Sequence, residues 1–140
     1  MVLERGTEAG IRTHAAAAYP HECCGALLGR VDRDERIITE AWPIANGASD
    51  RARRFTVSAG DYQGAETRAR LAGLALLGFY HSHPDAPAAP SQEDLARAWP
   101  NFNYIIVSVV KAMPAELTCW RLREDRSAFE REDITWPTAF

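Results

Sequence analysis

The sequence predicts a domain of the α/β or α+β class, in which a mixed β-sheet lies between helices. Its 140 residues suggest one domain with a real hydrophobic core. Hydrophobic residues make up 46% and charged residues 25% of the chain, as is usual for soluble globular proteins. Apolar runs of strand length alternate with helical segments, and hairpin turns join some of these runs. This mixture of hairpins and helices is what predicts a mixed sheet.

The first third of the chain predicts one helix and one β-hairpin. Residues 7–18 are expected to be helical because the threonine at their start can cap a helix, alanines fill the last turns, and Pro20 prevents continuation. Residues 23–28 are a short apolar run flanked by glycine, which is typical of a buried strand. The charged residues 30–36 would form the turn, and residues 36–44 the returning strand.

After a loop of turn-forming residues at 46–50, strands and helices alternate. The strand segments are rich in β-branched and aromatic residues, and each helix begins at a serine that can cap it. The expected strands are residues 54–57, 74–80, 104–110, 115–122 and 129–135, with a hairpin turn at 111–114, and the expected helices are residues 58–71 and 91–99.

Charge and composition argue against several classes of function. The net charge is −3, so no basic surplus indicates binding to nucleic acid or to an anionic membrane. No apolar run approaches the ~20 residues of a membrane-spanning helix, and the first residues lack the apolar core of a secretory signal. The odd number of cysteines, Cys23, Cys24 and Cys119, suits a reducing compartment. We therefore expect a cytoplasmic protein with small, buried, free cysteines, of unknown oligomeric state.

Two histidines stand at the end of the strand expected over residues 74–80. His81 and His83 are two residues apart, so in extended backbone they point to the same face, roughly 6.5–7 Å apart along the strand. That separation lets both imidazoles converge on one metal ion at ~2.0–2.1 Å. Pro84 disfavours a helix at His83 and so supports the extended geometry, whereas Ser82 would point to the other face in a structural role.

A possible third ligand follows the proline-rich loop of residues 84–90, which can deliver the next helix to a fixed place. Ser91 and Asp94 form a capping-box pattern, so Asp94 could simply cap that helix. Its spacing from the histidines favours a ligand role instead. Two imidazoles and one carboxylate leave one tetrahedral position for water, as in catalytic zinc sites, and the absence of thiolates disfavours structural zinc or an iron–sulfur cluster.

Activating a water at such a site needs a base that is not itself a ligand. Glu22 is the candidate, because it lies where the first helix ends and a buried strand begins. On the residues alone, the alternative is an exposed, solvated glutamate.

Together these residues resemble the signature of the JAMM (MPN+) metalloproteases: a glutamate, then H-[ST]-H, seven residues beginning with proline, a serine, two residues and an aspartate. The chain supplies Glu22, His81-Ser82-His83, residues 84–90, Ser91 and Asp94 with this spacing. The similarity extends to the Tyr-Pro before the glutamate, to Asn46, to Arg54-Phe55 and to residues 104–110. It is greatest with the short prokaryotic members that carry Glu-Cys-Cys-Gly, such as bacterial peptidases of sulfur-carrier adducts.

The resemblance implies a single JAMM/MPN+ metallopeptidase domain over residues 1–140, with a cytidine-deaminase-like fold, a curved mixed sheet and one zinc ion at the sheet edge. It implies that His81, His83 and Asp94 are the zinc ligands. Glu22 would be the general base that activates the water and then protonates the leaving amine. Ser91 would either donate to the developing oxyanion or serve only as the helix N-cap.

The same resemblance implies zinc-dependent hydrolysis after the C-terminal Gly-Gly of a ubiquitin-like or sulfur-carrier protein, for example release of cysteine from a carrier–cysteine adduct. The strand before the histidines, or the segment near Arg54, could offer an edge for the substrate tail. Arg51, Arg53 and Arg54 are either a contact to an acidic carrier or a solvated loop. The alternative function is a non-catalytic MPN-type binding module, which would predict a broken metal motif. A nucleobase deaminase would need H-x-E and P-C-x-x-C, and both are absent.

Overall fold

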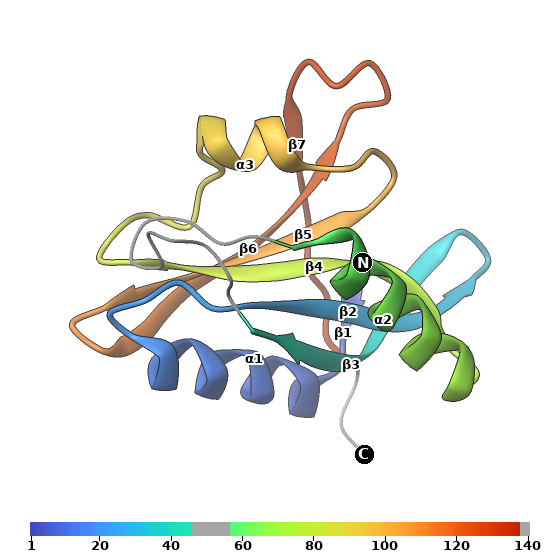
Figure 1. Cartoon of the computed structure of the whole chain (residues 1–140), viewed down its shortest axis with the longest axis horizontal. Helices are drawn as coiled ribbons and strands as arrows, with labels where there is room; N and C mark the ends of the chain where they lie inside the picture. Colours follow the sequence, from blue (N-terminus) through green and yellow to red (C-terminus); the bar gives the residue numbers. More distant parts are fainter. Residues whose placement is uncertain (46–56, 138–140) are drawn as a thin grey trace.

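The computed structural model describes residues 1–45 and 57–137. Within them, one seven-stranded mixed sheet is flanked by helices (Figure 1). The strands are β1 (Val2–Leu3), β2 (Cys24–Asp32), β3 (Glu35–Ile44), β4 (Ala75–Pro84), β5 (Asn103–Val110), β6 (Met113–Leu122) and β7 (Phe129–Glu132). The helices are α1 (Arg5–Ala18), α2 (Ala59–Leu71) and α3 (Gln92–Arg97).

Strand β4 lies at the centre of the sheet, whose order is β1-β3-β2-β4-β5-β6-β7. It pairs antiparallel with β2 on one side and parallel with β5 on the other. The parallel pair is joined by the crossover that contains α3, as parallel strands require. Because β4 is hydrogen-bonded on both sides, the prediction that it offers a free edge to a substrate tail is wrong. The histidines lie instead near the end of β4, at the border of the sheet where the strands stop.

The β2–β3 and β5–β6 hairpins turn more tightly than the sequence predicts. Arg33 and Asp34 connect β2 to β3 with φ of 51° and 68°, and Lys111 and Ala112 connect β5 to β6 with φ of 49° and 67°. Left-handed backbone at both residues of a two-residue turn matches the twist of the flanking strands. The predicted turns at 30–36 and 111–114 are therefore too long, because the strands continue into both segments and leave only two residues between them.

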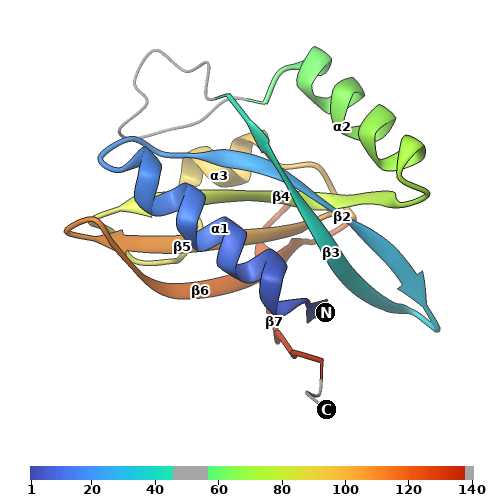
Figure 2. The ribbon, with the colours of Figure 1, turned by 90° about the horizontal axis from the view of Figure 1, so that it is seen from below.

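Helices lie on both faces of the sheet (Figure 2), and each face carries its own core. Helix α1 buries Ile11 and Ala15 on one face, where Tyr80 also packs. Helices α2 and α3 cover the other face, around Phe79. Neighbouring strand residues point to opposite faces, so Phe79 and Tyr80 contribute to different cores. The residues that follow Phe79 on its face are His81 and His83.

Several sequence predictions need correction. Helix α1 begins at Arg5, and its N-cap residue Glu4 makes no side-chain cap. Thr7 is inside the helix, where its buried hydroxyl donates to the carbonyl of Thr39 at 2.8 Å. The two-residue strand β1 was not predicted. The last strand stops at Glu132, three residues earlier than expected. The predicted loop at 46–50 and most of the strand at 54–57 lie outside the described residues.

Two expectations about the whole chain agree with the structure. Cys23, Cys24 and Cys119 are buried free thiols, as predicted. Among residues 1–45 and 57–137, no helix has the length and apolar character to cross a membrane.

Candidate metal centre

Two imidazoles point from the end of β4 toward the side of the sheet covered by α3. His81 and His83 are both buried, at 1% and 8% exposure, because β2 and β5 flank the strand that carries them. Ser82 points to the opposite face, as predicted. Its Oγ accepts a hydrogen bond of 2.9 Å from the backbone N–H of Cys23.

The third donor arrives on the first turn of α3. Asp94 Oδ2 lies 3.2 Å from His81 Nε2 and 3.1 Å from His83 Nε2, and the two Nε2 atoms are 3.1 Å apart. The ligand atoms of a tetrahedral zinc ion at ~2.0–2.1 Å lie roughly 3.3–3.4 Å from one another. The three donors therefore have the chemistry and, within a few tenths of an ångström, the spacing of three corners of a zinc site.

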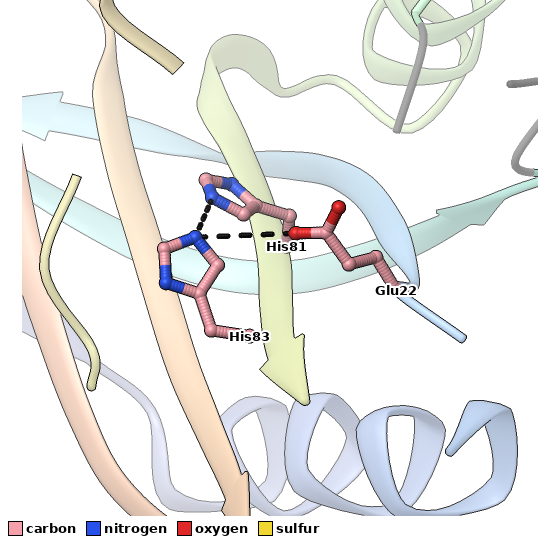
Figure 3. Close-up of side chains that lie close together, drawn as sticks. All are labelled: Glu22, His81 and His83. Carbon is pink, nitrogen blue, oxygen red and sulfur yellow. Dashed lines mark hydrogen bonds and ion pairs between the residues drawn. The ribbon is translucent and has the colours of Figure 1, made fainter. Parts of the chain in front are cut away.

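Glu22 approaches the same pair from the start of β2 (Figure 3). Its Oε1 lies 3.9 Å from His83 Nε2, and its ligand atom and those of the two histidines are all within 4.8 Å of one another. That wider group could also hold an ion, but the triangle with Asp94 is tighter and nearer to ligand spacing. Of the two carboxylates, Asp94 therefore lies nearer to the two imidazoles than Glu22 does.

Glu22 is only 4% exposed, so the alternative of a solvated surface glutamate is wrong. Its position follows from the pairing of β2 with β4. The N–H of Cys23 donates to the Ser82 side chain, and the Ser82 N–H donates to the Cys23 carbonyl at 3.1 Å. The residue after Glu22 is thereby bound to the residue between the histidines, which brings the carboxylate to the site.

The charges of the cluster support one another. Burial would raise the pKa of Asp94, but His81, His83 and the Ser91 N–H hold it well below its usual range. Burial lowers the pKa of His81 despite the pull of Asp94. Burial acts in the same sense on His83, yet Asp94 and the Pro87 carbonyl raise its pKa overall. The Asp94 carboxylate therefore stays ionised although it is buried, because the two imidazoles and the Ser91 N–H stabilise its charge.

Asp94 performs two tasks with one oxygen atom. The Ser91 N–H donates to Asp94 Oδ2 at 2.8 Å, and the Asp94 N–H donates to Ser91 Oγ at 3.0 Å, which closes the capping box. Oδ2 is also the atom that faces both histidines. The cap uses Ser91 Oγ as an acceptor, so its proton can still donate, and the two interpretations of Ser91 are compatible.

A largely apolar cavity of about 210 Å³ opens beside His81 and Asp94. The cavity cannot be predicted from the sequence, because its aromatic walls come from separate segments of the chain with no common spacing. These walls are Phe79, Trp99, Tyr104 and Phe129. Asn46, Phe55 and the basic cluster Arg51, Arg53 and Arg54 lie outside the described residues.

Comparison with known proteins gives a consistent result. A family model described as prokaryotic homologs of the JAB domain matches residues 5–123. The chain is 37% identical over 98 residues to a desampylase of Haloferax volcanii, which covers 69% of each protein. A Salinibacter ruber protein is 44% identical, with a TM-score of 0.79 over 98% of this chain and 92% of that one. A JAB1/MPN domain protein of Archaeoglobus fulgidus, 21% identical, shares the fold with a TM-score of 0.63 over 97% and 98% of the two chains.

Proposed function

Because this chain belongs to the family of prokaryotic JAB-domain homologs, we propose that it is a zinc-dependent metallopeptidase. Its membership confirms the resemblance to the prokaryotic branch of the JAMM/MPN+ proteins, and its mixed sheet flanked by helices is the fold of their solved structures. The proposed reaction is hydrolysis of the peptide or isopeptide bond that follows the C-terminal Gly-Gly of a ubiquitin-like or sulfur-carrier protein. The proposal covers residues 1–140 as a single catalytic domain acting in the cytoplasm.

One observation carries the proposal: three donors of catalytic-zinc type form a triangle with sides of 3.1–3.2 Å, and a second carboxylate lies just outside it. His81, His83 and Asp94 would hold one zinc ion. Two imidazoles and a carboxylate are a ligand set that leaves a position open, as catalytic zinc sites do. A bound zinc ion would supply Lewis acidity, which polarises a scissile carbonyl and makes a water molecule more acidic.

The remaining chemistry belongs to Glu22 and Ser91. We assign to Glu22 the role of general base, since its buried carboxylate faces His83 at 3.9 Å without completing the triangle. It would take a proton from the attacking water and then give it to the leaving amine. Ser91 Oγ would donate its remaining proton to the developing oxyanion while it continues to cap α3, a contribution of roughly 2.7–4 kcal/mol for such donors.

The substrate class rests on the relative named a desampylase, which points to a hydrolase that removes ubiquitin-like proteins. A Gly-Gly tail suits this site because it has no side chains, and the proposed ligands His83 and Asp94 are both buried. The leaving group remains open between a cysteine, a short peptide extension and an isopeptide-linked lysine. The cavity of about 210 Å³ beside His81 and Asp94 supports a leaving group larger than a single small residue.

Intact mass spectrometry would test the proposal. Zinc-loaded protein is incubated with ubiquitin-like carriers that bear a C-terminal cysteine, a short extension or an isopeptide-linked peptide, with Glu22→Gln in parallel. We expect the wild type alone to leave carriers ending in Gly-Gly. Binding without any change of mass would instead favour the non-catalytic binding module, and equal cleavage by both proteins would reject Glu22 as the base.

A further inference from the structure

Three successive backbone carbonyls in the loop between β4 and α3 accept hydrogen bonds from three neighbouring strands. The carbonyl of Ala86 accepts from Ser108 Oγ of β5 at 2.6 Å. The carbonyl of Pro87 accepts from His83 Nδ1 of β4 at 2.8 Å. The carbonyl of Ala88 accepts from Thr118 Oγ1 of β6 at 2.6 Å. The loop is therefore fixed to the sheet on both sides of the residue that contacts His83.

The hydrogen bond to the Pro87 carbonyl determines that Nδ1 of His83 carries a proton. A carbonyl oxygen can only accept, so Nδ1 must carry the proton. In a neutral imidazole, Nε2 then has the free lone pair, and Nε2 is the atom that faces His81 and Asp94. A hydrogen bond at the second ring nitrogen is how proteins set the tautomer and orientation of metal-binding histidines.

Ser108 and Thr118 are well placed to hold this loop rigidly. Both are buried, and both lie in the strand register beside the histidines: Ser108 pairs with His83, while Ile106 pairs with both His81 and Thr118. The Thr118 hydroxyl is itself held, since Trp120 Nε1 donates to it at 2.8 Å. The Thr118 hydroxyl therefore has a contact within the sheet that does not depend on the loop.

We propose that Ser108 and Thr118 are positioning residues of the metal centre. By fixing the carbonyls of Ala86 and Ala88, they hold the Pro87 carbonyl where it selects the His83 tautomer, and they set the path by which the loop delivers Asp94. This inference rests on the proposed metal site. It assigns a role in metal binding to two strand residues that lie outside the JAMM motif and do not touch the ion.

The test measures zinc affinity and the His83 tautomer separately. Thr118→Val removes the hydroxyl at nearly constant volume, Ser108→Ala removes the second hydroxyl, and Thr118→Ser keeps the hydroxyl. We expect zinc affinity, measured by competition with a chromophoric chelator, to fall about 10-fold in the first two variants and to be close to wild type in Thr118→Ser. Long-range ¹H–¹⁵N correlation spectra of the metal-free proteins should show the hydrogen-bonded Nδ1–H of His83 in the wild type and in Thr118→Ser, and its loss in the first two variants.

Thr7→Val is the matched control. Its buried hydroxyl also donates to a backbone carbonyl, that of Thr39 at 2.8 Å, but it lies on α1 across the sheet from the histidines. It should lose thermal stability much as Thr118→Val does, while both zinc affinity and the His83 tautomer stay unchanged. This comparison separates a positioning role from general destabilisation.

The outcomes distinguish this inference from the proposed function. If Thr118→Val and Ser108→Ala bind zinc as tightly as the wild type with the same His83 tautomer, the positioning role is overturned. If the wild type binds no zinc, the metal centre is rejected, and the metal-free spectra still decide whether these hydroxyls control His83. If Thr118→Val fails to fold, Ser108→Ala still supplies both measurements, the zinc affinity and the His83 spectrum.

Discussion

Glu22 is buried beside His83 but stands outside the triangle formed by His81, His83 and Asp94, and this placement favours the proposed role of base over that of ligand. Glu22→Gln keeps the shape and removes the proton acceptor. We expect hydrolysis to fall by about 10²–10⁴-fold, the usual contribution of general acid–base catalysis, while zinc binding stays intact. Metal analysis together with mass spectrometry checks both parts. Loss of zinc in Glu22→Gln would identify Glu22 as a ligand and contradict the assigned role.

The charges around His83 predict how metal binding depends on pH. Burial lowers its pKa, but the hydrogen bonds to Asp94 and Pro87 raise it above the ordinary 6.5. An imidazole binds metal only when neutral, so zinc must displace a proton from His83 below that raised pKa. On acidification, zinc affinity should therefore begin to fall above pH 6.5. Chelator competition over a pH series measures this, and affinity that stays constant down to that pH would contradict it.

Sequence spacing could bring His81, His83 and Asp94 together because the histidines share a strand and a constrained loop leads to Asp94. It could not place Glu22, which reaches them only through the pairing of β2 with β4 and the bond between Cys23 and Ser82. Only the resemblance to the family pattern connects Glu22 to the histidines at the level of sequence. The supporting hydroxyls of Ser108 and Thr118 had no such pattern, since polar residues in buried strands do not show which carbonyl they will meet.

At the scale of elements, substitution by alanine should have opposite effects at two glycines. Gly25 lies where β2 packs closely against β4, and Gly10 lies on an open part of helix α1. A Cβ on Gly25 would lie 2.2 Å from the ring of Tyr80, which is buried next to His81. Gly25→Ala should therefore destabilise the fold by about 1–3 kcal/mol and weaken zinc binding. Gly10 is within helix α1, and nothing lies within 4 Å of a Cβ built there, so Gly10→Ala should stabilise by up to ~1 kcal/mol. Thermal unfolding of both variants measures the pair, and equal shifts would show that the Tyr80 contact does not matter.

Elements whose signals are local were predicted best. Ser58 and Ser91 cap α2 and α3 through capping boxes, as their sequences indicate, because a cap depends on residues within one turn. The predicted start of α1 was wrong because it depends on a distant contact. The Thr7 hydroxyl donates to the carbonyl of Thr39 on β3 and does not cap its own helix. Strand β1 pairs with β3 at the edge of the sheet. It could not be predicted, because two residues are too few to show a periodic pattern.

At the scale of the whole molecule, the metal should stabilise this fold without being required for it. The proposed ligands come from β4 and α3, whereas the cores on the two sheet faces are built by apolar residues from every layer. This differs from small zinc domains, in which the metal replaces a core. Zinc at 100 times its dissociation constant would add about 2.7 kcal/mol, or roughly 5–10 °C in Tm for a chain of this size.

Chelation should therefore lower Tm by that amount and leave a cooperative unfolding transition and an unchanged far-UV circular dichroism spectrum. The change should be concentrated near the ligands: amide hydrogen exchange should increase in the loop after β4 and in α3, and remain slow in β2 and β3. His83→Ala provides the comparison, since its Tm should not respond to zinc. A metal-free protein without its secondary structure would show instead that the ion holds the sheet together.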